Sequence, residues 1–306
     1  MLETLGRLLP LTRYPYVGET INCPVCDHAS TVGVAMLDRR FKMLPTKCCD
    51  ACGLLFTNPM PTEDELTTYY TKYYRLDYQM ATTEPKSKHI VKRNREATLR
   101  IAHVKDLLPS KARTLDFGCG SGEFVSHMLK NGFDSHGFEP GETYGSYAQS
   151  NLGGRIKIEA WQNVSYDKPF DLVSCFHVVE HLRDPIAALS KMVNWLSPEG
   201  LVYIEVPDMG KVNPSKGFGG LHFAHVLGFN HHNLVLAALK VGLRPKVAVS
   251  PTGIVFERGV GEDADQIASR GRELSQEIYG NGCAYRSYVN YQFGKLMNRW
   301  PSQDVA

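Results

Sequence analysis

Short strands and helices alternate along the chain from Arg113 to about residue 260, and no other feature of the sequence limits the fold as much. β-Branched and aromatic runs predict strands, and apolar residues at helical spacing predict helices between them. The predicted strands cover 113–118, 134–140, 155–160, 170–176 and 201–207, and the predicted helices cover 89–108, 123–132, 184–200 and 233–243. This order predicts an α/β fold with a mostly parallel sheet and helices on both faces. Two last strands, 245–250 and 253–259, predict an antiparallel hairpin at the sheet edge.

A glycine-rich turn follows the first of these strands. Gly118, Gly120 and Gly122 are spaced G-x-G-x-G, and Asp116 precedes them. Such glycines let the backbone approach a ligand at the carboxyl end of a sheet. A dinucleotide site prefers G-x-G-x-x-G, whereas the ammonium and sulfonium groups of S-adenosylmethionine suit a nearby carboxylate. Glu139 ends the second strand, where it can accept hydrogen bonds from two ribose hydroxyls. The motif favours S-adenosylmethionine, with dinucleotide binding and a plain tight turn as alternatives.

Four segments carry a family resemblance. They read DFGCGSGEF, GFEP, FDLVSCFHVVEHLRDP and GLVYIEVPD, in this order between about residues 90 and 260. They resemble the class I S-adenosylmethionine-dependent methyltransferases, which implies a Rossmann-like methyltransferase sheet and methyl transfer from that cofactor. The resemblance also implies cofactor-binding roles. These fall to Asp116, Gly118, Cys119 and Gly120 around the methionine moiety, Glu139 and Pro140 at the ribose, Trp161 and Gln162 beside the adenine, and Phe176 and His177 beside the sulfonium.

Two cysteine pairs near the N-terminus have the spacing of a metal site. Cys23 and Cys26 form one C-x2-C knuckle, and Cys49 and Cys52 form the other. Four thiolates complete a closed tetrahedral site of the structural zinc type, so Zn²⁺ is the predicted metal. Cys48, beside Cys49, is an ambiguity, but only Cys49 completes the second pair. The alternative is free or disulfide-bonded cysteine.

The cysteine region narrows the resemblance. The run CPVC…CDACGLLFTNPMPTEDELTTYY resembles the zinc-binding module of the deoxysugar C-methyltransferase group, including its Tyr-rich segment. Members of that group usually carry a further C-terminal α/β domain, which the 306-residue sequence is expected to lack. The predicted parts are a zinc-binding module with the Tyr-rich segment at 1–80, the methyltransferase domain at 81–260 and a mostly helical extension at 261–306.

Histidine is the side chain best suited to act as a base near neutral pH. In the resembling C-methyltransferases, a Tyr-x-Glu-His arrangement supplies the base, and only its last residue matches here, as His225. His222 stands at the Tyr position and Ala224 at the Glu position. We expect His225 to be the base and His181 to position the acceptor, and His222 is a further catalytic candidate. The resemblance places Tyr74 in an acceptor lid. Packing or solvated histidines are the alternative.

Composition and charge exclude some partners. The net charge of +2 gives no basic excess for a nucleic-acid surface, so nucleic acid is an unexpected partner. No apolar run reaches the roughly 18 residues that span a bilayer, and the N-terminus does not resemble a signal peptide. We expect a cytoplasmic enzyme that methylates carbon or oxygen of a small polar acceptor such as a sugar, a sugar nucleotide or a natural-product intermediate. An NAD-dependent oxidoreductase and a zinc-ribbon nucleic-acid-binding protein are the alternative functions.

Overall fold

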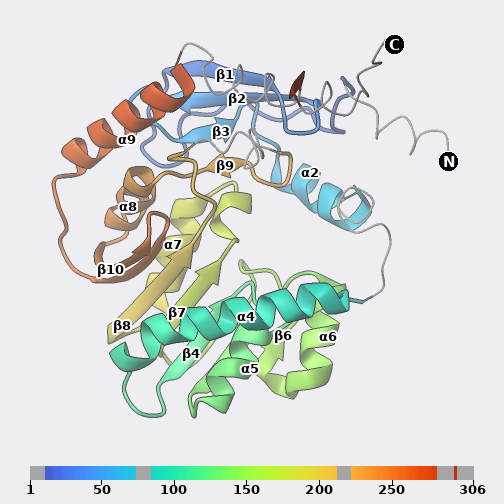
Figure 1. Ribbon diagram of the computed structural model, residues 1–306, viewed down its shortest axis with the longest axis vertical. Helices are drawn as coiled ribbons and strands as arrows, with labels where there is room; N and C mark the ends of the chain where they lie inside the picture. Colours follow the sequence, from blue (N-terminus) through green and yellow to red (C-terminus); the bar gives the residue numbers. More distant parts are fainter. Residues whose placement is uncertain (1–10, 74–83, 212–221, 281–292, 295–306) are drawn as a thin grey trace, which may run out of the picture.

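Two β-sheets and the helices packed on them form the protein. The computed structural model describes residues 11–73, 84–211, 222–280 and 293–294 (Figure 1). One sheet has seven strands in the order β10-β11-β8-β7-β4-β5-β6, and the other has four in the order β1-β2-β3-β9. No helix in these residues is both long and apolar enough to cross a membrane.

The seven-stranded sheet confirms the predicted α/β fold. Its strands are β4 (Arg113–Phe117), β5 (Asp134–Phe138), β6 (Ile156–Lys157), β7 (Phe170–Phe176), β8 (Leu196–Glu205), β10 (Leu243–Ser250) and β11 (Gly253–Arg258). The strands from β6 to β8 pair in parallel. β11 runs antiparallel to β8 and β10 antiparallel to β11, which confirms the predicted edge hairpin. The carboxyl ends of the parallel strands therefore share one edge, where ligands bind in such sheets.

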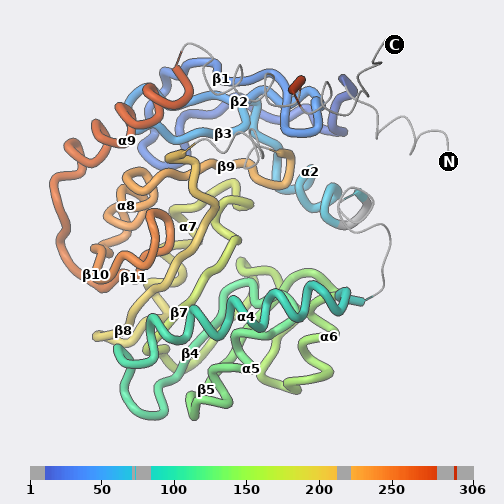
Figure 2. Tube along the Cα trace, viewed as in Figure 1, coloured from blue at the N-terminus to red at the C-terminus, as the bar shows by residue number. Residues whose placement is uncertain are grey.

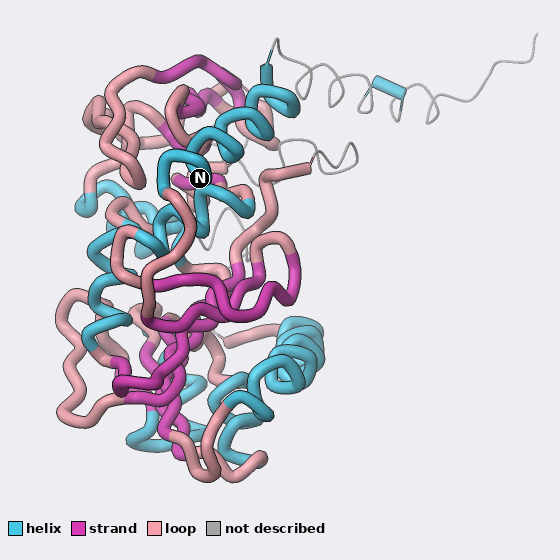
Figure 3. The backbone as a smooth tube through the Cα atoms, turned by 90° about the vertical axis from the view of Figure 1, so that its left-hand side faces the viewer, coloured by secondary structure: helices cyan, strands magenta, loops and turns pink. Residues whose placement is uncertain are grey.

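Helices cover both faces of this sheet, as Figure 3 shows. They are α4 (Ser87–Val104), α5 (Glu123–Lys130), α6 (Glu142–Leu152), α7 (Pro185–Asn194) and α8 (His231–Leu239). Because successive side chains of a strand point to opposite faces, β8 separates two groups of helices. Val202 and Ile204 share a buried cluster with α7 and α8, whereas Leu201 and Tyr203 share one with α4 and α5.

Two details of this region differ from the sequence-based expectation. The helix predicted over 184–200 ends at Asn194, because the chain enters β8 at Leu196 and the polar Ser197 and Glu199 belong to that strand. The helix α6 was not predicted. Only two of its residues, Gly145 and Ala148, are buried, so its sequence carries little apolar periodicity.

The four-stranded sheet lies near the carboxyl edge of the larger one, at the top of Figure 1. Its strands are β1 (Thr31–Leu37), β2 (Met43–Cys49), β3 (Leu55–Thr57) and β9 (Leu227–Gly228), all paired antiparallel. β9 comes from far along the chain, and Figure 2 shows this orange segment beside the blue N-terminal strands. A short helix, α2 (Glu63–Thr68), follows β3 and begins with a capping box between Thr62 and Glu65.

Of the predicted C-terminal extension, the structure describes residues 261–280 and 293–294, and one long helix lies in them. Helix α9 (Ala264–Tyr279) packs against α8 and the turn that carries the last two paired cysteines. The Ser275 hydroxyl donates to the carbonyl of Gly53 at 2.7 Å. A Cβ on Gly271 would lie 2.6 Å from the carbonyl oxygen of Cys52, so this close approach requires glycine.

Candidate active site

The glycine-rich loop between β4 and α5 has the backbone that its sequence predicts. Gly118, Gly120 and Gly122 have φ values of 73°, 54° and 84°, in the left-handed region that favours glycine. A Cβ on Gly118 would lie 2.7 Å from a methyl carbon of Val178. The loop therefore lies flat against the residues that follow β7, at the carboxyl edge of the sheet.

Glu139, directly after β5, closes this loop. Its Oε2 accepts a hydrogen bond from the amide of Gly120 at 3.1 Å, and its Oε1 accepts one from the amide of Gly141 at 2.8 Å. Burial raises the pKa of Glu139, and the two amides oppose that rise. The parallel pairing of β4 with β5 thus brings together the two parts of the predicted cofactor site.

Asp116 lies inside β4 and is buried. The hydroxyl of Ser174, on the neighbouring β7, donates to its Oδ1 at 2.7 Å. Burial raises the pKa of Asp116 to about 6, although Ser174 and the cationic Arg100 lower it. A buried carboxylate with this pKa is poised to pair with a cation at neutral pH.

The other predicted cofactor residues surround the same edge. Cys119 is buried in the loop, and its amide donates to the carbonyl of Phe138 at 2.8 Å. The Trp161 ring lies 6.3 Å from that of Phe117, and the carbonyl of Gln162 accepts from Lys191. Pro140 follows Glu139. These positions agree with the predicted site, and the individual roles stay predictions.

Phe176 is the last residue of β7, and His177 follows it. The Phe176 ring packs 4.9 Å from that of Phe124. His177 has a φ of 57°, and its amide donates to the carbonyl of Glu205 at 2.7 Å. Its Nε2 lies 3.2 Å from Glu205 Oε1, and its Nδ1 lies 3.5 Å from Glu180 Oε1. Burial disfavours the charged imidazole, but these two carboxylates outweigh it and raise the pKa of His177 to about 9.

An ion pair that the sequence did not reveal holds this histidine. Arg100, on α4, donates to both oxygens of Glu205, from Nε at 3.0 Å and from a terminal nitrogen at 2.8 Å. Burial favours the protonated Glu205, but His177 and Arg100 prevail and hold its pKa well below its usual range. The two residues are 105 positions apart, so no local pattern could have indicated the pair.

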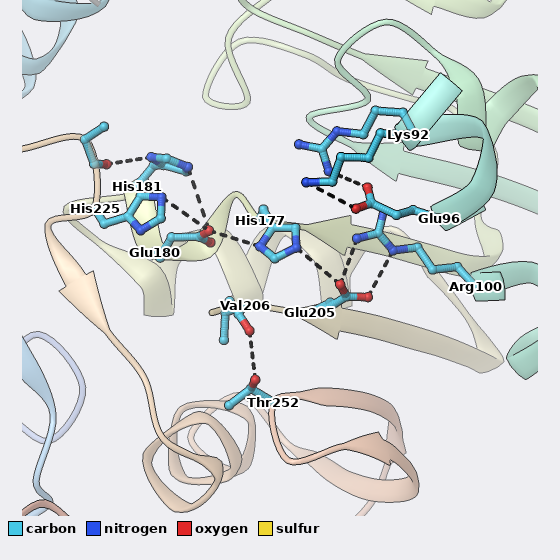
Figure 4. A network of polar contacts seen from close by, with 12 residues as sticks. Lys92, Glu96, Arg100, His177, Glu180, His181, Glu205, Val206, His225 and Thr252 are labelled. Carbon is cyan, nitrogen blue, oxygen red and sulfur yellow. Dashed lines mark hydrogen bonds and ion pairs between the residues drawn. The ribbon is translucent and has the colours of Figure 1, made fainter. Parts of the chain in front are cut away.

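The three predicted catalytic histidines come together next to His177. The ring of His181 lies 4.6 Å from that of His225, and His225 lies 3.9 Å from His222. Burial, followed by the neighbouring His225, lowers the pKa of His222. Between His177 and this group lies Glu180, as Figure 4 shows. Glu180 is only 1% exposed and is not among the predicted site residues.

The Tyr-rich segment reaches this cluster through a residue that was not predicted. The Tyr70 hydroxyl donates to the carbonyl of Ala224 at 3.1 Å and lies 2.9 Å from Nδ1 of His181. Tyr74, the predicted lid residue, lies outside the described residues. The resemblance of the N-terminal module pointed to this Tyr-rich segment, but which of its tyrosines contacts the cluster depends on the tertiary structure.

The four predicted zinc ligands converge. The sulfur atoms of Cys23, Cys26, Cys49 and Cys52 all lie within 4.8 Å of one another. Cys23 Sγ is 3.6 Å from Cys52 Sγ, and Cys26 Sγ is 3.5 Å from Cys49 Sγ. Cys48 belongs instead to a separate apolar cluster with Leu55, Met209 and Tyr279.

Comparison with known proteins now identifies the family. A family profile described as "Methyltransferase domain" matches residues 88–243 of the 306-residue chain. The chain belongs to this methyltransferase family. The match covers the glycine-rich loop, Glu139 and His181, and so favours the methyltransferase interpretation over a dinucleotide-dependent oxidoreductase.

Several curated proteins resemble this methyltransferase chain. The ubiquinone biosynthesis O-methyltransferase of Rickettsia prowazekii is 30% identical over 129 residues, which are 39% of this chain and 49% of the relative. The enzyme of the same name from Rickettsia typhi is 27% identical over 135 residues, which are 42% and 52% of the two chains. The chain spans about half the length of these relatives. Among solved structures, CalS10, an amino pentose methyltransferase from Micromonospora echinaspora, has a TM-score of 0.46 at 19% identity, with 58% of this chain and 99% of that chain covered.

Proposed function

We propose that the protein binds S-adenosylmethionine and transfers its methyl group to a small polar acceptor. The observation that carries this proposal is the glycine-rich loop closed by Glu139, whose carboxylate lies 3.1 Å from the amide of Gly120. The outer lone pairs of this carboxylate are suited to accept from both ribose hydroxyls. Asp116 supplies the negative charge that an ammonium group requires. Membership of the methyltransferase family supports the same cofactor.

Methyl transfer from a sulfonium is an in-line displacement, so the protein mainly has to position the two reactants. A hydroxyl or an acidic carbon must also lose its proton. The cluster of His181, His222 and His225 is the group proposed to act on the acceptor, with His225 foremost. Tyr74 stays a predicted lid residue.

The acceptor class rests on resemblance. The N-terminal module resembles that of the deoxysugar C-methyltransferases, which favours a sugar, a sugar nucleotide or a related natural-product intermediate. The relatives named as ubiquinone biosynthesis O-methyltransferases support oxygen as an alternative to carbon. The division at residues 80 and 260 and the cytoplasmic location stay predictions.

Binding of the cofactor can be tested directly. Isothermal titration of the purified chain with S-adenosylmethionine, S-adenosylhomocysteine, NAD and NADP is expected to show micromolar affinity for the first two alone. Binding of NAD alone would contradict the proposal and favour an oxidoreductase.

Cofactor binding is expected to weaken in acid because of Asp116. Its pKa of about 6 means that it is anionic at pH 7.5 and increasingly protonated below pH 6. A protonated Asp116 no longer attracts the ammonium group, so the affinity for S-adenosylhomocysteine should fall by up to about tenfold per pH unit in that range. Titrations at pH 7.5, 6.5 and 5.5 measure this slope. Asp116→Asn should bind weakly and lack the slope, and an equally steep slope in that variant would show that another group is responsible.

We also propose that Cys23, Cys26, Cys49 and Cys52 bind a structural zinc ion. A tetrahedral site with Zn–S bonds of about 2.3 Å has sulfur atoms about 3.8 Å apart, close to the 3.5 and 3.6 Å distances found here. The donor set fits Zn²⁺, which soft thiolates select. When bound, the ion would join the two knuckles at the base of the four-stranded sheet.

Zinc content is expected to depend on Cys49 and not on its neighbour. Purified protein should contain one zinc per chain, and Cys49→Ser should contain none because it loses a ligand. Cys48→Ser is the matched control, since Cys48 lies outside the cluster. Metal analysis and thermal unfolding of the two variants measure the effect. If the Cys48→Ser protein lacked zinc and the Cys49→Ser protein retained it, Cys48 and not Cys49 would be the ligand.

A further inference from the structure

We propose that Glu180, His181 and His225 form a second metal site, which binds one divalent first-row ion such as Mn²⁺. Their ligand atoms all lie within 4.8 Å of one another. Glu180 Oε1 lies 3.8 Å from His181 Nε2 and 3.9 Å from His225 Nε2. Two imidazoles and one carboxylate are a recognised ligand set for such ions, and they leave coordination positions open.

The buried carboxylate of Glu180 is the first observation that points to a cation. Glu180 is 1% exposed, and neither of its oxygens accepts a hydrogen bond from the described part of the chain. Burying an ionised carboxylate that accepts no hydrogen bond is costly, and the ion pair with His177 at 3.5 Å satisfies only one side of it, whereas such groups are normally hydrogen-bonded or bound to a metal. Figure 4 shows this carboxylate pointing between the surrounding histidine rings.

The hydrogen bonding of His181 is the second observation. Its Nδ1 lies 2.5 Å from the carbonyl oxygen of Ala224. Because a carbonyl can only accept, Nδ1 carries a proton, and the neutral ring then has its lone pair on Nε2, toward Glu180. This lone pair and the carboxylate repel each other unless a proton or a metal ion lies between them, and a metal ion fits the separation of 3.8 Å. Histidine ligands of metals commonly donate their other ring nitrogen to a backbone carbonyl in this way.

The two distances from the Glu180 carboxylate to the histidines are slightly longer than those around a bound ion. With metal–ligand distances of about 2.1 Å, adjacent ligand atoms lie about 3.0–3.4 Å apart, against 3.8 and 3.9 Å here. Both histidines lie beside short irregular segments and not inside long helices. His181 ends a single 3₁₀ turn, and His225 follows a turn in which its amide donates to the carbonyl of His222.

His177 does not occupy this position. Its Nδ1 lies 3.5 Å from the same Glu180 oxygen, on the opposite side of the carboxylate. Its Nε2 forms a second ion pair, with Glu205 at 3.2 Å. Figure 4 shows His177 on one side of the Glu180 carboxylate and His181 and His225 on the other. A chain of ion pairs therefore reaches one side of Glu180, from Arg100 through Glu205 and His177. The two histidine ligands, His181 and His225, lie on the other side.

This inference deepens the proposed function and rests on it for the acceptor. An ion at this site has open positions that an oxygen of the acceptor can fill, so a hydroxyl or enolisable carbonyl compound is the class of acceptor it suits. His225 would then hold the ion through its Nε2, and the ion would bind the acceptor.

Mn²⁺ titration followed by electron paramagnetic resonance tests the site. The free hexa-aqua ion gives a strong six-line signal that decreases on binding, and thiolates at the zinc cluster are poor ligands for Mn²⁺. The zinc-loaded 306-residue chain should bind one equivalent of Mn²⁺. Glu180→Gln and His181→Gln should abolish this binding. His136→Gln is the matched control, because His136 also pairs with a carboxylate, Asp134 at 3.3 Å, but outside this site.

A second variant guards against misfolding of the first two. Tyr70→Phe removes the hydroxyl beside His181 and Ala224, and it should weaken Mn²⁺ binding about 10–100-fold with the ligands intact. Mn²⁺ binding that is unaffected by Glu180→Gln overturns the proposal. So does a chain that binds S-adenosylhomocysteine but no Mn²⁺, and that result leaves the proposed methyltransferase function standing. Mn²⁺ binding that Glu180→Gln abolishes, without any binding of S-adenosylhomocysteine, supports the site and contradicts the function.

Discussion

Replacing Glu139 by Ala is expected to weaken S-adenosylmethionine binding by about 100-fold or more. Each hydrogen bond between a ribose hydroxyl and an ionised carboxylate is worth about 1.5–3 kcal/mol, and the substitution removes two. A loss of 1.4 kcal/mol is about tenfold in the dissociation constant. The variant also frees the amide of Gly120, which Glu139 holds at 3.1 Å, so the loop loses its anchor as well. Isothermal titration with S-adenosylhomocysteine measures the change.

The control for Glu139→Ala is a neighbouring carboxylate outside the site. Glu142, in the first turn of α6, is exposed, and its replacement by Ala should leave the affinity unchanged. Thermal unfolding of both variants checks that the fold is kept. Retained cofactor affinity in a folded Glu139→Ala chain would remove the central support of the proposed function.

Replacing His225 by Ala is expected to abolish turnover and to leave cofactor affinity intact. His225 lies in the histidine cluster beside Glu180 and outside the glycine-rich loop. A group that removes a proton from the acceptor contributes about 10²–10⁴-fold to the rate. If His225 instead binds a metal ion that orients the acceptor, its loss also lowers the rate. The measurement is release of S-adenosylhomocysteine with an acceptor that the unsubstituted chain methylates, together with titration of the cofactor.

His231→Ala is the matched control for His225→Ala. His231 follows β9 as His225 precedes it, but its Nδ1 contacts the carbonyl of Pro251 at 2.7 Å, away from Glu180. Turnover should be unaffected in this variant. Unchanged turnover in His225→Ala would assign acceptor activation to another residue, and weaker cofactor binding would place His225 in the cofactor site.

The order of strands and helices was predictable because it depends on local patterns. The alternation after Arg113 indicated the parallel sheet and its antiparallel edge, and both are present. Errors occurred where the local pattern was weak. Helix α6 buries only two side chains, and the segment after Asn194 is polar although it begins β8. In such segments tertiary pairing outweighs intrinsic preference.

The sequence by itself determined the features built from neighbouring residues. These are the left-handed turns at Gly118, Gly120 and Gly122 and the two cysteine knuckles, since backbone sterics and short spacing fix them. The parallel pairing of β4 with β5 follows from the alternation, and so Glu139 could be placed beside the loop before the fold was known.

Only the tertiary structure decided which distant groups share the histidine cluster. The pairing of β9 with β3 brings His225 to the edge where His181 ends its turn. Tyr70 meets Ala224 across 154 positions, and Arg100 meets Glu205 across 105. Contacts of this kind come from folding the whole chain, because no periodicity or spacing couples residues so far apart. The burial of Glu180 between these segments follows from the same folding, and with it the candidate site for a second metal.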